Sequence, residues 1–309
     1  MTVVNTPARG KVNVALIQIR AATEDKVETC GHMRELVLRA VEEGRAKGDP
    51  LHMAVLPEMW NSIMTVEAFE KASEPVPSAR QPRDEWPEGS YTCQALSDVA
   101  KEAGIWIIGG SIPEKRGEKL YNCATVYDSD GQLVKVYRKT HLFDLCLPTM
   151  TYKESAQFSP GDSLGLFETP FGKFAVAICY DIRFPELAAI AGRNDCLAMF
   201  YPAAFNMTTG PLHWELLQRS RALDNQLYVA TCSPARDTSA KYVVWGHSLA
   251  VSPMGQVVAS AEIDETIVHV ALDPQVVEDT KAGIPVGVQR RFDLYTDVAA
   301  SHPREQLFS

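Results

Sequence analysis

No apolar run in this chain is long enough to cross a bilayer, which argues against an integral membrane protein with helical spans. The opening segment, 1–11, lacks the apolar core of a secretory signal and the Arg-rich pattern of a strong transit peptide. A formal net charge of −9 disfavours nucleic acid and anionic membranes as partners, although a local cation can still attract a small anion. We therefore expect a cytoplasmic protein with no membrane or nucleic-acid partner, and a partial mitochondrial pool is compatible with the same sequence.

The chain also lacks any C-x-x-C pair among its seven cysteines, so we predict no zinc site and no other metal centre. Cysteines scattered through apolar runs are typical of free thiols in a reducing compartment. Cys179 alone lies in a context that indicates chemistry. The other six are interpreted as small buried hydrophobic residues, namely Cys30, Cys93, Cys123, Cys146, Cys196 and Cys232.

No linker rich in Pro, Gly or Ser divides the 309 residues, so we predict a single domain over 1–309, with its core at about 12–272 and a C-terminal helix and tail at 273–309. Segment 73–89, rich in proline and charge, is interpreted as a long surface excursion. Hydrophobic periodicity predicts strands at 12–19, 52–56, 105–108, 120–127, 132–137, 173–178, 196–201, 227–232, 246–252, 256–261 and 267–272, and helices at 28–46, 91–103, 184–192, 211–224 and 274–282. This alternation indicates an α/β fold, and periodicity alone allows either two packed sheets or one doubly wound sheet.

Cys179 lies between a buried apolar run, 174–178, and a polar run that begins a helix at 180–187. This pattern predicts a strand that ends in a tight turn, which holds the thiol rigidly at the strand's end, as in a nucleophile elbow. A thiolate near neutral pH needs a base or a positive neighbour. Glu58, Lys139 and Glu154 are the candidates for these partners, because Glu58 and Lys139 follow predicted strands and Glu154 lies farther along the same region.

The motifs around these four residues resemble the nitrilase superfamily of carbon–nitrogen hydrolases, which carries a Glu-Lys-Cys triad and a second glutamate. The resemblance spans about 12–295, and three motifs in the right order are far more specific than any one of them. It implies a four-layer α-β-β-α sandwich, a homodimer and no cofactor. The matching segments are Leu56-Pro57-Glu58, Arg138-Lys139-Thr140-His141-Leu142-Phe143 and Ile178-Cys179-Tyr180-Asp181-Ile182-Arg183-Phe184-Pro185-Glu186-Leu187.

The resemblance also implies a role for each residue. Cys179 attacks an amide carbonyl and forms a thioester, and Glu58 serves as the general base. Lys139 and the backbone N–H of Tyr180 stabilise the oxyanion, while Glu154 either orients Lys139 or assists proton movement near the leaving group. His141 has two interpretations, a general base or a structural histidine of the same loop, and we favour the second.

A narrower resemblance, carried by segments 201–217, 233–237 and 245–248, is to the ω-amidase branch. That branch hydrolyses the terminal amide of α-ketoglutaramate and α-ketosuccinamate to 2-oxoglutarate or oxaloacetate plus ammonia, within glutamine metabolism. Such anionic substrates need a cation, and Arg183 is interpreted either as a carboxylate clamp or as the ion-pair partner of Glu186 or Asp181. The remaining candidates for substrate binding are Tyr180, Phe205, Met207 and Thr208.

Three alternatives to an ω-amidase remain open at this stage. The first is another amidase of the superfamily, either a deaminated-glutathione amidase or an N-carbamoyl amidohydrolase. The second is nitrile hydrolysis, since a thiol can also attack a nitrile. The third, an inactive member that serves as an interaction scaffold, is disfavoured because Glu58, Lys139, Glu154 and Cys179 are all present. The C-terminal segment 290–295 resembles the tail that crosses to the partner in the family's dimers.

Overall fold

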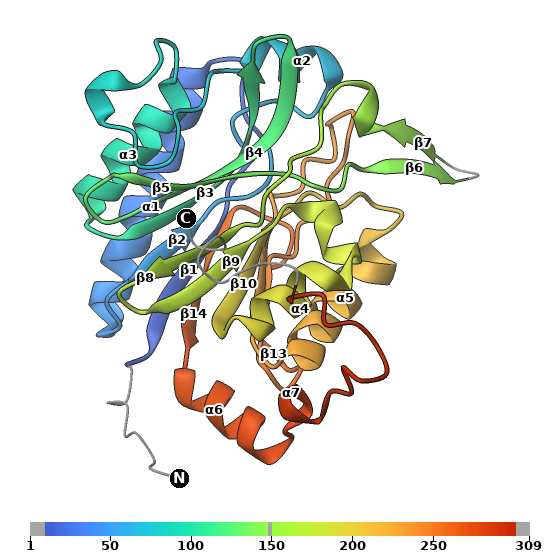
Figure 1. Cartoon of the computed structure of the whole chain (residues 1–309). Coiled ribbons are helices and arrows are strands. Elements are labelled where there is room, and N and C mark those ends of the chain that lie inside the picture. Colours follow the sequence, from blue (N-terminus) through green and yellow to red (C-terminus); the bar gives the residue numbers. More distant parts are fainter. Residues whose placement is uncertain (1–9, 148–149, 301–309) are drawn as a thin grey trace.

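Two six-stranded sheets lie face to face between two layers of helices (Figure 1). The structure is a computed structural model and describes residues 10–147 and 150–300. The layers are those of the four-layer α-β-β-α sandwich that the sequence resemblance implies, so the two-sheet interpretation is correct and the doubly wound one is wrong. The chain builds one sheet mainly from its first half and the other from its second.

The first sheet has the strand order β14-β1-β2-β3-β4-β5. Its three central strands, β1, β2 and β3, are parallel, and β14 and β4 pair antiparallel at their flanks. The last strand of the chain therefore lies beside the first. The bounds are β1 Val12–Gln18, β2 Met53–Val55, β3 Trp106–Arg116, β4 Lys119–Tyr127, β5 Leu133–Arg138 and β14 Thr266–Leu272.

The second sheet repeats this plan with the strand order β13-β12-β11-β10-β9-β8. Its parallel centre is formed by β9, β10 and β11, and antiparallel strands again flank it. The bounds are β8 Leu166–Thr169, β9 Gly172–Val176, β10 Cys196–Pro202, β11 Tyr228–Cys232, β12 Leu249–Val251 and β13 Val257–Ser260. A separate hairpin, β6 Asp144–Leu147 and β7 Met150–Lys153, projects from the body (Figure 1).

Strand β1 shows why the sheets pack in this way. Successive side chains of a strand point to opposite faces. Val14 and Leu16 belong to the apolar core between the two sheets, whereas Ala15 and Ile17 belong to the core between the first sheet and its helices. Cys232 of β11 joins the layers further, since its thiol donates to the carbonyl of Ile17 at 3.3 Å. Both faces of the first sheet are thus covered.

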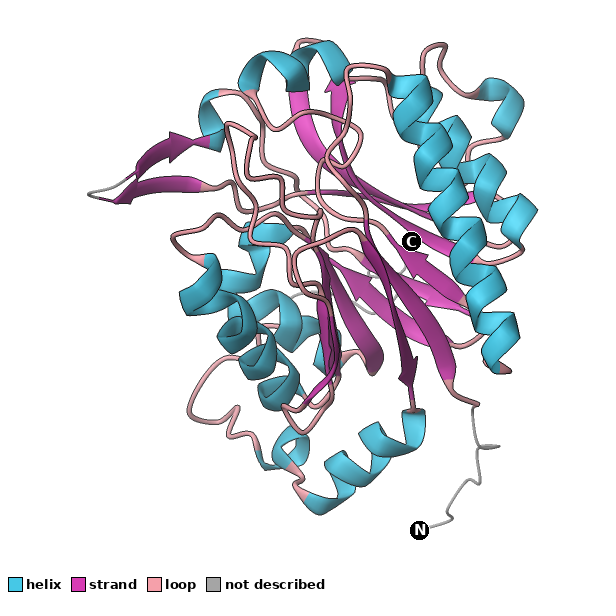
Figure 2. Ribbon diagram, turned by 180° about the vertical axis from the view of Figure 1, so that it is seen from behind, coloured by secondary structure: helices cyan, strands magenta, loops and turns pink. Residues whose placement is uncertain are grey.

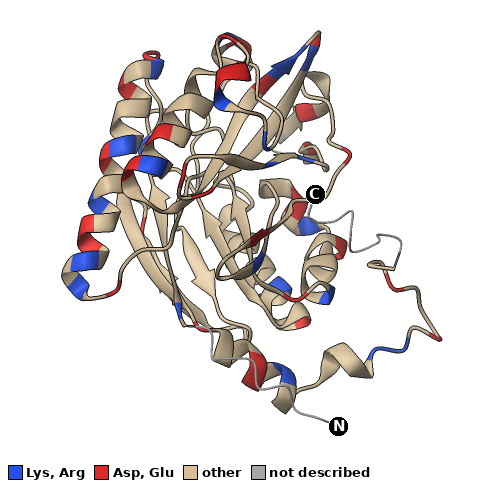
Figure 3. Cartoon of the chain, turned by 60° about the vertical axis from the view of Figure 1, so that its left-hand side comes forward, with Lys and Arg blue, Asp and Glu red and all other residues tan. Residues whose placement is uncertain are grey.

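Helices form the two outer layers (Figure 2). Helices α1 Lys26–Lys47 and α3 Tyr91–Ala103 cover the first sheet, and α4 Pro185–Arg193 and α5 Gly210–Asn225 cover the second. The charged side chains lie mostly on the outer helices and loops, and the strands between them carry few (Figure 3). The remaining α-helices of the described ranges are α2 Val66–Ala72, α6 Pro274–Gly283 and α7 Val286–Gln289. No helix in the described ranges is long and apolar enough to span a membrane.

One strand prediction needs correction. The strand predicted at 105–108 continues through Gly109 and Gly110 to Arg116, because a bulge in the β3–β4 pairing absorbs the glycine pair. The sequence analysis also missed β8, the β6–β7 hairpin and α2, whose short segments mix polar and apolar residues.

Segment 73–89 is anchored rather than free at its start. Glu74 is buried there, pairs with Lys26 at 2.8 Å and accepts the N–H of Thr92 at the start of α3.

Candidate active site

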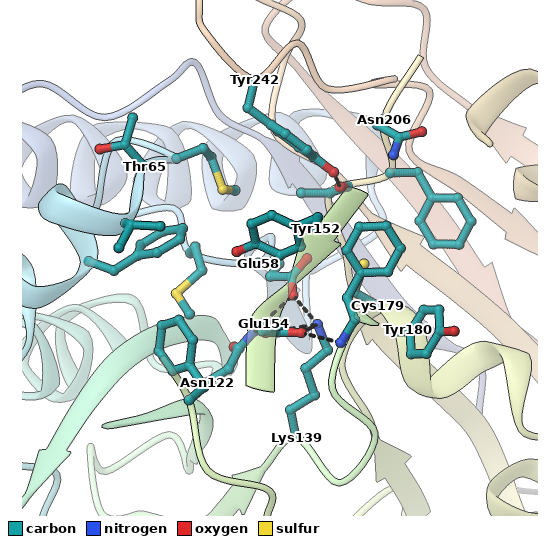
Figure 4. Close-up of a pocket in the computed structure, with 18 of the residues that line it drawn as sticks. Glu58, Thr65, Asn122, Lys139, Tyr152, Glu154, Cys179, Tyr180, Asn206 and Tyr242 are labelled. Atoms are coloured by element: carbon teal, nitrogen blue, oxygen red, sulfur yellow. Dashed lines mark hydrogen bonds and ion pairs between the residues drawn. The ribbon is translucent and has the colours of Figure 1, made fainter. Parts of the chain in front are cut away.

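A pocket of about 270 Å³ opens where the strands of both sheets end, and all four residues of the predicted catalytic set line it. Figure 4 shows Glu58, Lys139 and Glu154 converging at its centre, with Asn122 and Cys179 beside them. The first sheet delivers Glu58, Lys139 and Asn122, and the second delivers Cys179. The pocket exists because the two sheets bring their strand ends to one place.

Glu58 projects from the turn that follows β2, and the bulge in β3 shapes this turn. Gly110 has a φ of +66°, and a Cβ there would come within 2.2 Å of the carbonyl oxygen of Pro57. The close approach lets Ser111 N–H donate to that carbonyl at 3.1 Å, while the Ser111 hydroxyl accepts the N–H of Met59. The glycine pair thus lets the Glu58 turn pack directly on the neighbouring strand.

Lys139 follows β5 and is 2% exposed. Its ammonium donates to Glu58 Oε1 at 2.9 Å and lies 2.9 Å from Glu154 Oε2. Burial acts to lower the pKa of Lys139, but the charges of Glu154 and Glu58 outweigh it and raise that pKa well above its usual value. The side chain therefore stays an ammonium at neutral pH.

Glu154 begins a short 3₁₀ turn directly after β7, at the root of the projecting hairpin. Its carboxylate accepts the N–H of Phe143 at 2.6 Å, and its own N–H donates to the Phe143 carbonyl. These two bonds close the root of the hairpin and aim Glu154 at Lys139. Glu154 thus also follows a strand, a placement that the sequence analysis missed because it did not predict β7.

Asn122 on β4 is a site residue that the sequence analysis missed. Its side-chain N–H₂ donates to Glu58 Oε1 at 2.8 Å and to Glu154 Oε1 at 3.1 Å. The backbone carbonyl of Asn122 accepts the backbone N–H of Lys139 at 2.8 Å. Asn122 therefore holds both carboxylates and the lysine in register. A buried asparagine within an apolar strand was the available signal.

Cys179 lies just beyond β9 in a left-handed conformation, with a φ of +46°. A non-glycine residue held in this region indicates a constrained turn, as predicted for a nucleophile elbow. Burial and the neighbouring Glu58 raise the pKa of the Cys179 thiol well above its usual value, whereas Lys139 and the Ala204 N–H act to lower it. The resting sulfur is therefore a thiol, and its proton lies next to Glu58.

Asp181 fixes the turn that carries Cys179, and His141 is one of its partners. The fully buried Asp181 carboxylate accepts the N–H of Ile178 at 2.9 Å and that of His141 at 2.9 Å. The imidazole of His141 lies 2.8 Å from Asp181 and stacks on Phe184. His141 does not line the pocket, in agreement with its interpretation as a structural histidine.

Arg183, Tyr180 and Phe205, three of the predicted substrate-binding residues, do line the pocket. The Arg183 guanidinium lies 5.5 Å from the Tyr180 ring centre and 5.1 Å from that of Phe205. Among the described residues no carboxylate pairs with it, so the ion-pair interpretation is wrong. Asp181 faces away toward His141, and Arg183 is left as a half-buried cation facing the pocket.

The prediction that Met207 and Thr208 line the site is wrong. Both are exposed and lie outside the pocket lining, where Asn206 and Thr209 take their place. The Asn206 side-chain carbonyl accepts the N–H groups of Thr208 and Thr209 at 3.0 and 2.8 Å. This tight turn at the start of α5 directs the two intervening side chains outward.

The oxygen and nitrogen groups of this site do not form a metal centre. Within the described ranges no group of three or more His, Cys, Asp and Glu side chains is arranged to hold a metal ion. The carboxylates of Glu58 and Glu154 are instead bound to Lys139 and Asn122. An organic electrophile next to Cys179 would meet a thiol, a base and a cation within one pocket.

Comparisons with known proteins agree with this geometry. The carbon-nitrogen hydrolase family model matches residues 13–282. Omega-amidase NIT2 of Danio rerio is 46% identical, over 93% of this chain and 97% of the relative, and omega-amidase NIT3 of Saccharomyces cerevisiae is 42% identical, over 94% and 97%. The crystal structure of Saccharomyces cerevisiae Nit3, a member of branch 10 of the nitrilase superfamily, aligns with a TM-score of 0.82 at 40% identity, over 93% of this chain and 99% of that one. The chain therefore belongs to the carbon-nitrogen hydrolase family, within the nitrilase superfamily.

Proposed function

We propose that this protein is an ω-amidase, which hydrolyses the terminal amide of a small α-keto acid amide to the dicarboxylic acid and ammonia. The observation that carries the proposal is Arg183, a half-buried cation without a carboxylate partner among the described residues, in the same pocket as Cys179. A buried charge without a partner is costly, so an anionic ligand group is its natural complement. Relatives at 42–49% identity named omega-amidase support the same activity.

Substrate binding follows from the two ends of such a molecule. Its α-carboxylate pairs with Arg183, whose fork of N–H donors matches a carboxylate. Its terminal amide then lies between Cys179 and Lys139. Tyr180 and Phe205, whose rings flank the guanidinium, bury the short carbon chain.

Acylation is the first half of the proposed reaction. The Cys179 sulfur attacks the amide carbon while its proton passes to Glu58, and the carbonyl becomes a tetrahedral oxyanion. The ammonium of Lys139 and the backbone N–H of Tyr180 stabilise that charge. Glu58 returns the proton to the amide nitrogen, the C–N bond breaks, and ammonia leaves behind a thioester on Cys179.

Deacylation uses the same carboxylate again. Glu58 takes a proton from a water molecule that attacks the thioester carbon, and Lys139 stabilises the second oxyanion. Collapse releases the carboxylic acid and restores the Cys179 thiol with the proton from Glu58. Glu154 and Asn122 keep Lys139 and Glu58 aligned through both halves of the reaction. Glu154 binds the Lys139 ammonium, and the Asn122 side chain binds the carboxylates of Glu58 and Glu154.

The test is ammonia release by the purified protein from α-ketoglutaramate, with succinamate and glutamine in parallel and Cys179→Ala as the control. We expect rapid release from α-ketoglutaramate and none from the variant. Glutamine, which carries an ammonium in place of the keto group, should react slowly beside Arg183. A protein whose Cys179 reacts with a thiol reagent but which releases no ammonia from α-ketoglutaramate would be another amidase of the superfamily.

A homodimer is the assembly that we propose. Helix α5 carries exposed apolar side chains on the outer layer, among them Leu212 at 66% and Leu216 at 61% exposure. Such a face on the outside of a sandwich is suited to a second copy. Light scattering of the wild type should give twice the 34.1 kDa mass of one chain. A Leu216→Glu variant should shift toward the single-chain mass. A wild-type protein of single-chain mass would contradict the proposal.

The cytoplasm is the compartment that we propose for this activity. All seven cysteines are free thiols, and six of them are buried, with Cys146 exposed. The sequence interpretation of six buried structural cysteines is thus wrong for Cys146 alone. An exposed thiol that stays unpaired is compatible with a reducing compartment. Fractionation of the source cells, probed with an antibody against the protein, tests this placement.

A further inference from the structure

We propose that His213 is a positioning residue that holds the Arg183 guanidinium in the orientation that selects carboxylate-bearing amides. The inference rests on the proposed function and adds a determinant of specificity outside the catalytic set. His213 lies in the first turn of α5 and does not line the pocket. It therefore acts on the substrate only through Arg183.

The contact that carries the inference joins Arg183 Nη1 and His213 Nδ1 at 3.2 Å. A guanidinium has N–H donors and no acceptor, so His213 Nδ1 must accept this hydrogen bond. The imidazole is then neutral, with its proton on Nε2. This is a specific requirement, because a doubly protonated ring has no free lone pair to offer.

The surroundings of His213 favour that neutral form. Burial, and then the charge of Arg183, lower the pKa of His213 from its usual 6.5. Its place at the N-terminal end of α5 acts in the same direction, because the helix dipole disfavours a cation there. Arg183 faces His213 from the neighbouring element, and the nearby charges of α5, Glu215 and Arg219, pair with each other at 3.2 Å.

Helix α5 also fixes the other end of Arg183. Arg221, two turns after His213, donates from Nη2 to the Arg183 backbone carbonyl at 3.2 Å and from Nε to that of Ile182 at 2.9 Å. One helix therefore holds both the main chain and the tip of Arg183. The two aromatic rings of Tyr180 and Phe205 confine the guanidinium between these points.

This arrangement leaves most of the guanidinium for a ligand. One N–H of Nη1 goes to His213, and among the described residues the Arg183 guanidinium has no other hydrogen-bond partner. The remaining donors can form the paired bonds that a carboxylate accepts. Without His213 the long side chain would populate several rotamers, and only part of the population would match the substrate.

The experiment compares two amides that differ in one group. Succinamate carries a carboxylate where butyramide carries a methyl group, so the ratio of their KM values isolates the contribution of Arg183. We expect His213→Ala to raise KM for succinamate roughly tenfold, the effect of one hydrogen bond to a charged group, with kcat and the butyramide constants unchanged. His213→Asn, whose side-chain oxygen replaces Nδ1 as an acceptor, should restore the wild-type ratio.

A pH series supplies a second readout that needs no unstable variant. Below the lowered pKa of His213 the ring gains a proton, loses its acceptor and repels Arg183. The succinamate-to-butyramide KM ratio of the wild type should therefore rise as the pH falls through the His213 pKa, which lies below its usual 6.5, and that of His213→Asn should stay flat. Titration of the Cys179 thiol affects both amides and cancels in the ratio.

The outcomes distinguish a failure of this inference from a failure of the proposed function. Equal changes for both amides in His213→Ala would make the residue merely structural and overturn the inference. The inference would also fail if His213→Ala kept the wild-type succinamate-to-butyramide KM ratio while Arg183→Met lost the preference for succinamate. That result would leave the proposed function intact. Turnover of butyramide with no preference for succinamate in the wild-type protein would overturn both.

Discussion

The hydroxyl of Tyr137 donates a 2.7 Å hydrogen bond to the carboxylate of Asp181, and this bond joins the strand that leads to Lys139 with the turn that carries Cys179. Tyr137 belongs to β5 of the first sheet, and Asp181 belongs to the 3₁₀ turn that follows β9 of the second sheet. Both side chains are buried, so the bond is shielded from water. The spacing of the cation and the nucleophile therefore depends on a pair that touches neither.

Replacement of Asp181 by asparagine should separate these two elements. The amide keeps the shape but replaces one carboxylate oxygen with an N–H₂ group. Depending on which oxygen is replaced, the Tyr137 hydroxyl and the Ile178 N–H, or the Thr140 hydroxyl and the His141 N–H, lose their acceptor. Each unsatisfied buried donor costs about 1–3 kcal/mol, so we expect a lower free energy of unfolding and a large fall in kcat. Urea unfolding and steady-state kinetics measure both. Asp130→Asn, at an exposed hairpin turn that accepts Asn-Gly, should change neither.

Gly110→Ala tests the packing of the Glu58 turn. Gly117→Ala is the matched control, because Gly110 lies in β3 and Gly117 lies in the turn directly after β3. Both glycines have positive φ, +66° and +61°, but a Cβ at 110 would meet the Pro57 carbonyl at 2.2 Å, whereas nothing lies within 4 Å of one at 117. We expect Gly117→Ala to cost only the left-handed conformation, about 1–2 kcal/mol, and to keep full activity. Gly110→Ala should lose more stability and most of kcat. Equal effects of the two variants would show that the close approach is unimportant.

The division of labour between the two glutamates is measurable at the thiol itself. Because the pKa of Cys179 is raised, alkylation near neutral pH depends on Glu58 to take the proton. Glu58→Gln should therefore lower both the labelling rate of Cys179 and kcat, the latter by about 10²–10⁴-fold. Glu154→Gln should lower kcat while labelling persists.

Iodoacetamide labelling followed by peptide mass mapping gives the rate at each cysteine. The experiment needs a Cys146→Ser background, because Cys146 is the one exposed thiol and would compete for reagent. Unchanged labelling of Cys179 in Glu58→Gln would remove Glu58 as the base.

Alkaline pH should destabilise the fold through its structural thiols. Burial raises the pKa of Cys30 and of Cys196 to about 12, from an ordinary 9.0, and it also raises those of Cys93, Cys123 and Cys232. The folded chain keeps these protons while the unfolded chain releases them above pH 9. Their contribution to stability is therefore complete below the unfolded pKa and is lost as the pH rises.

We expect the free energy of unfolding in urea, under reducing conditions, to fall between pH 8.5 and 10. Each thiol adds a slope of up to about 1.4 kcal/mol per pH unit. Cys196→Ala should make the fall in the free energy of unfolding shallower by the contribution of one thiol, up to about 1.4 kcal/mol per pH unit. A stability that stays constant to pH 10 would contradict the raised values.

Sequence patterns predicted the parts of the fold where local signals are strong. The helix at 91–103 ends at Gly104, which the structure places in the left-handed conformation, so the predicted and observed bounds agree. The convergence of Glu58, Lys139 and Cys179 was also predictable, because each follows a strand and strand ends meet at one edge of an α/β sheet. A resemblance was still needed to choose two packed sheets over one.

The rest of the site depends on contacts between segments that are far apart in sequence. Asn122 lies in a strand whose neighbours are apolar, and only the structure shows that both glutamates turn toward it. The prediction that Met207 and Thr208 line the pocket was wrong, because the Asn206 turn, rather than residue type, decides which side chains face the pocket. His213 lies within segment 201–217, but the resemblance gives it no role, and its contact with Arg183 crosses 30 residues.

The pairing of β14 with β1 has a consequence for synthesis on the ribosome. Residues 12–18 emerge long before their antiparallel neighbour, 266–272. Until then one edge of the first sheet presents unpaired backbone groups, and such an edge readily recruits another chain. Nascent chains truncated before residue 266 should therefore aggregate or engage chaperones, whereas release of the full-length chain closes that edge.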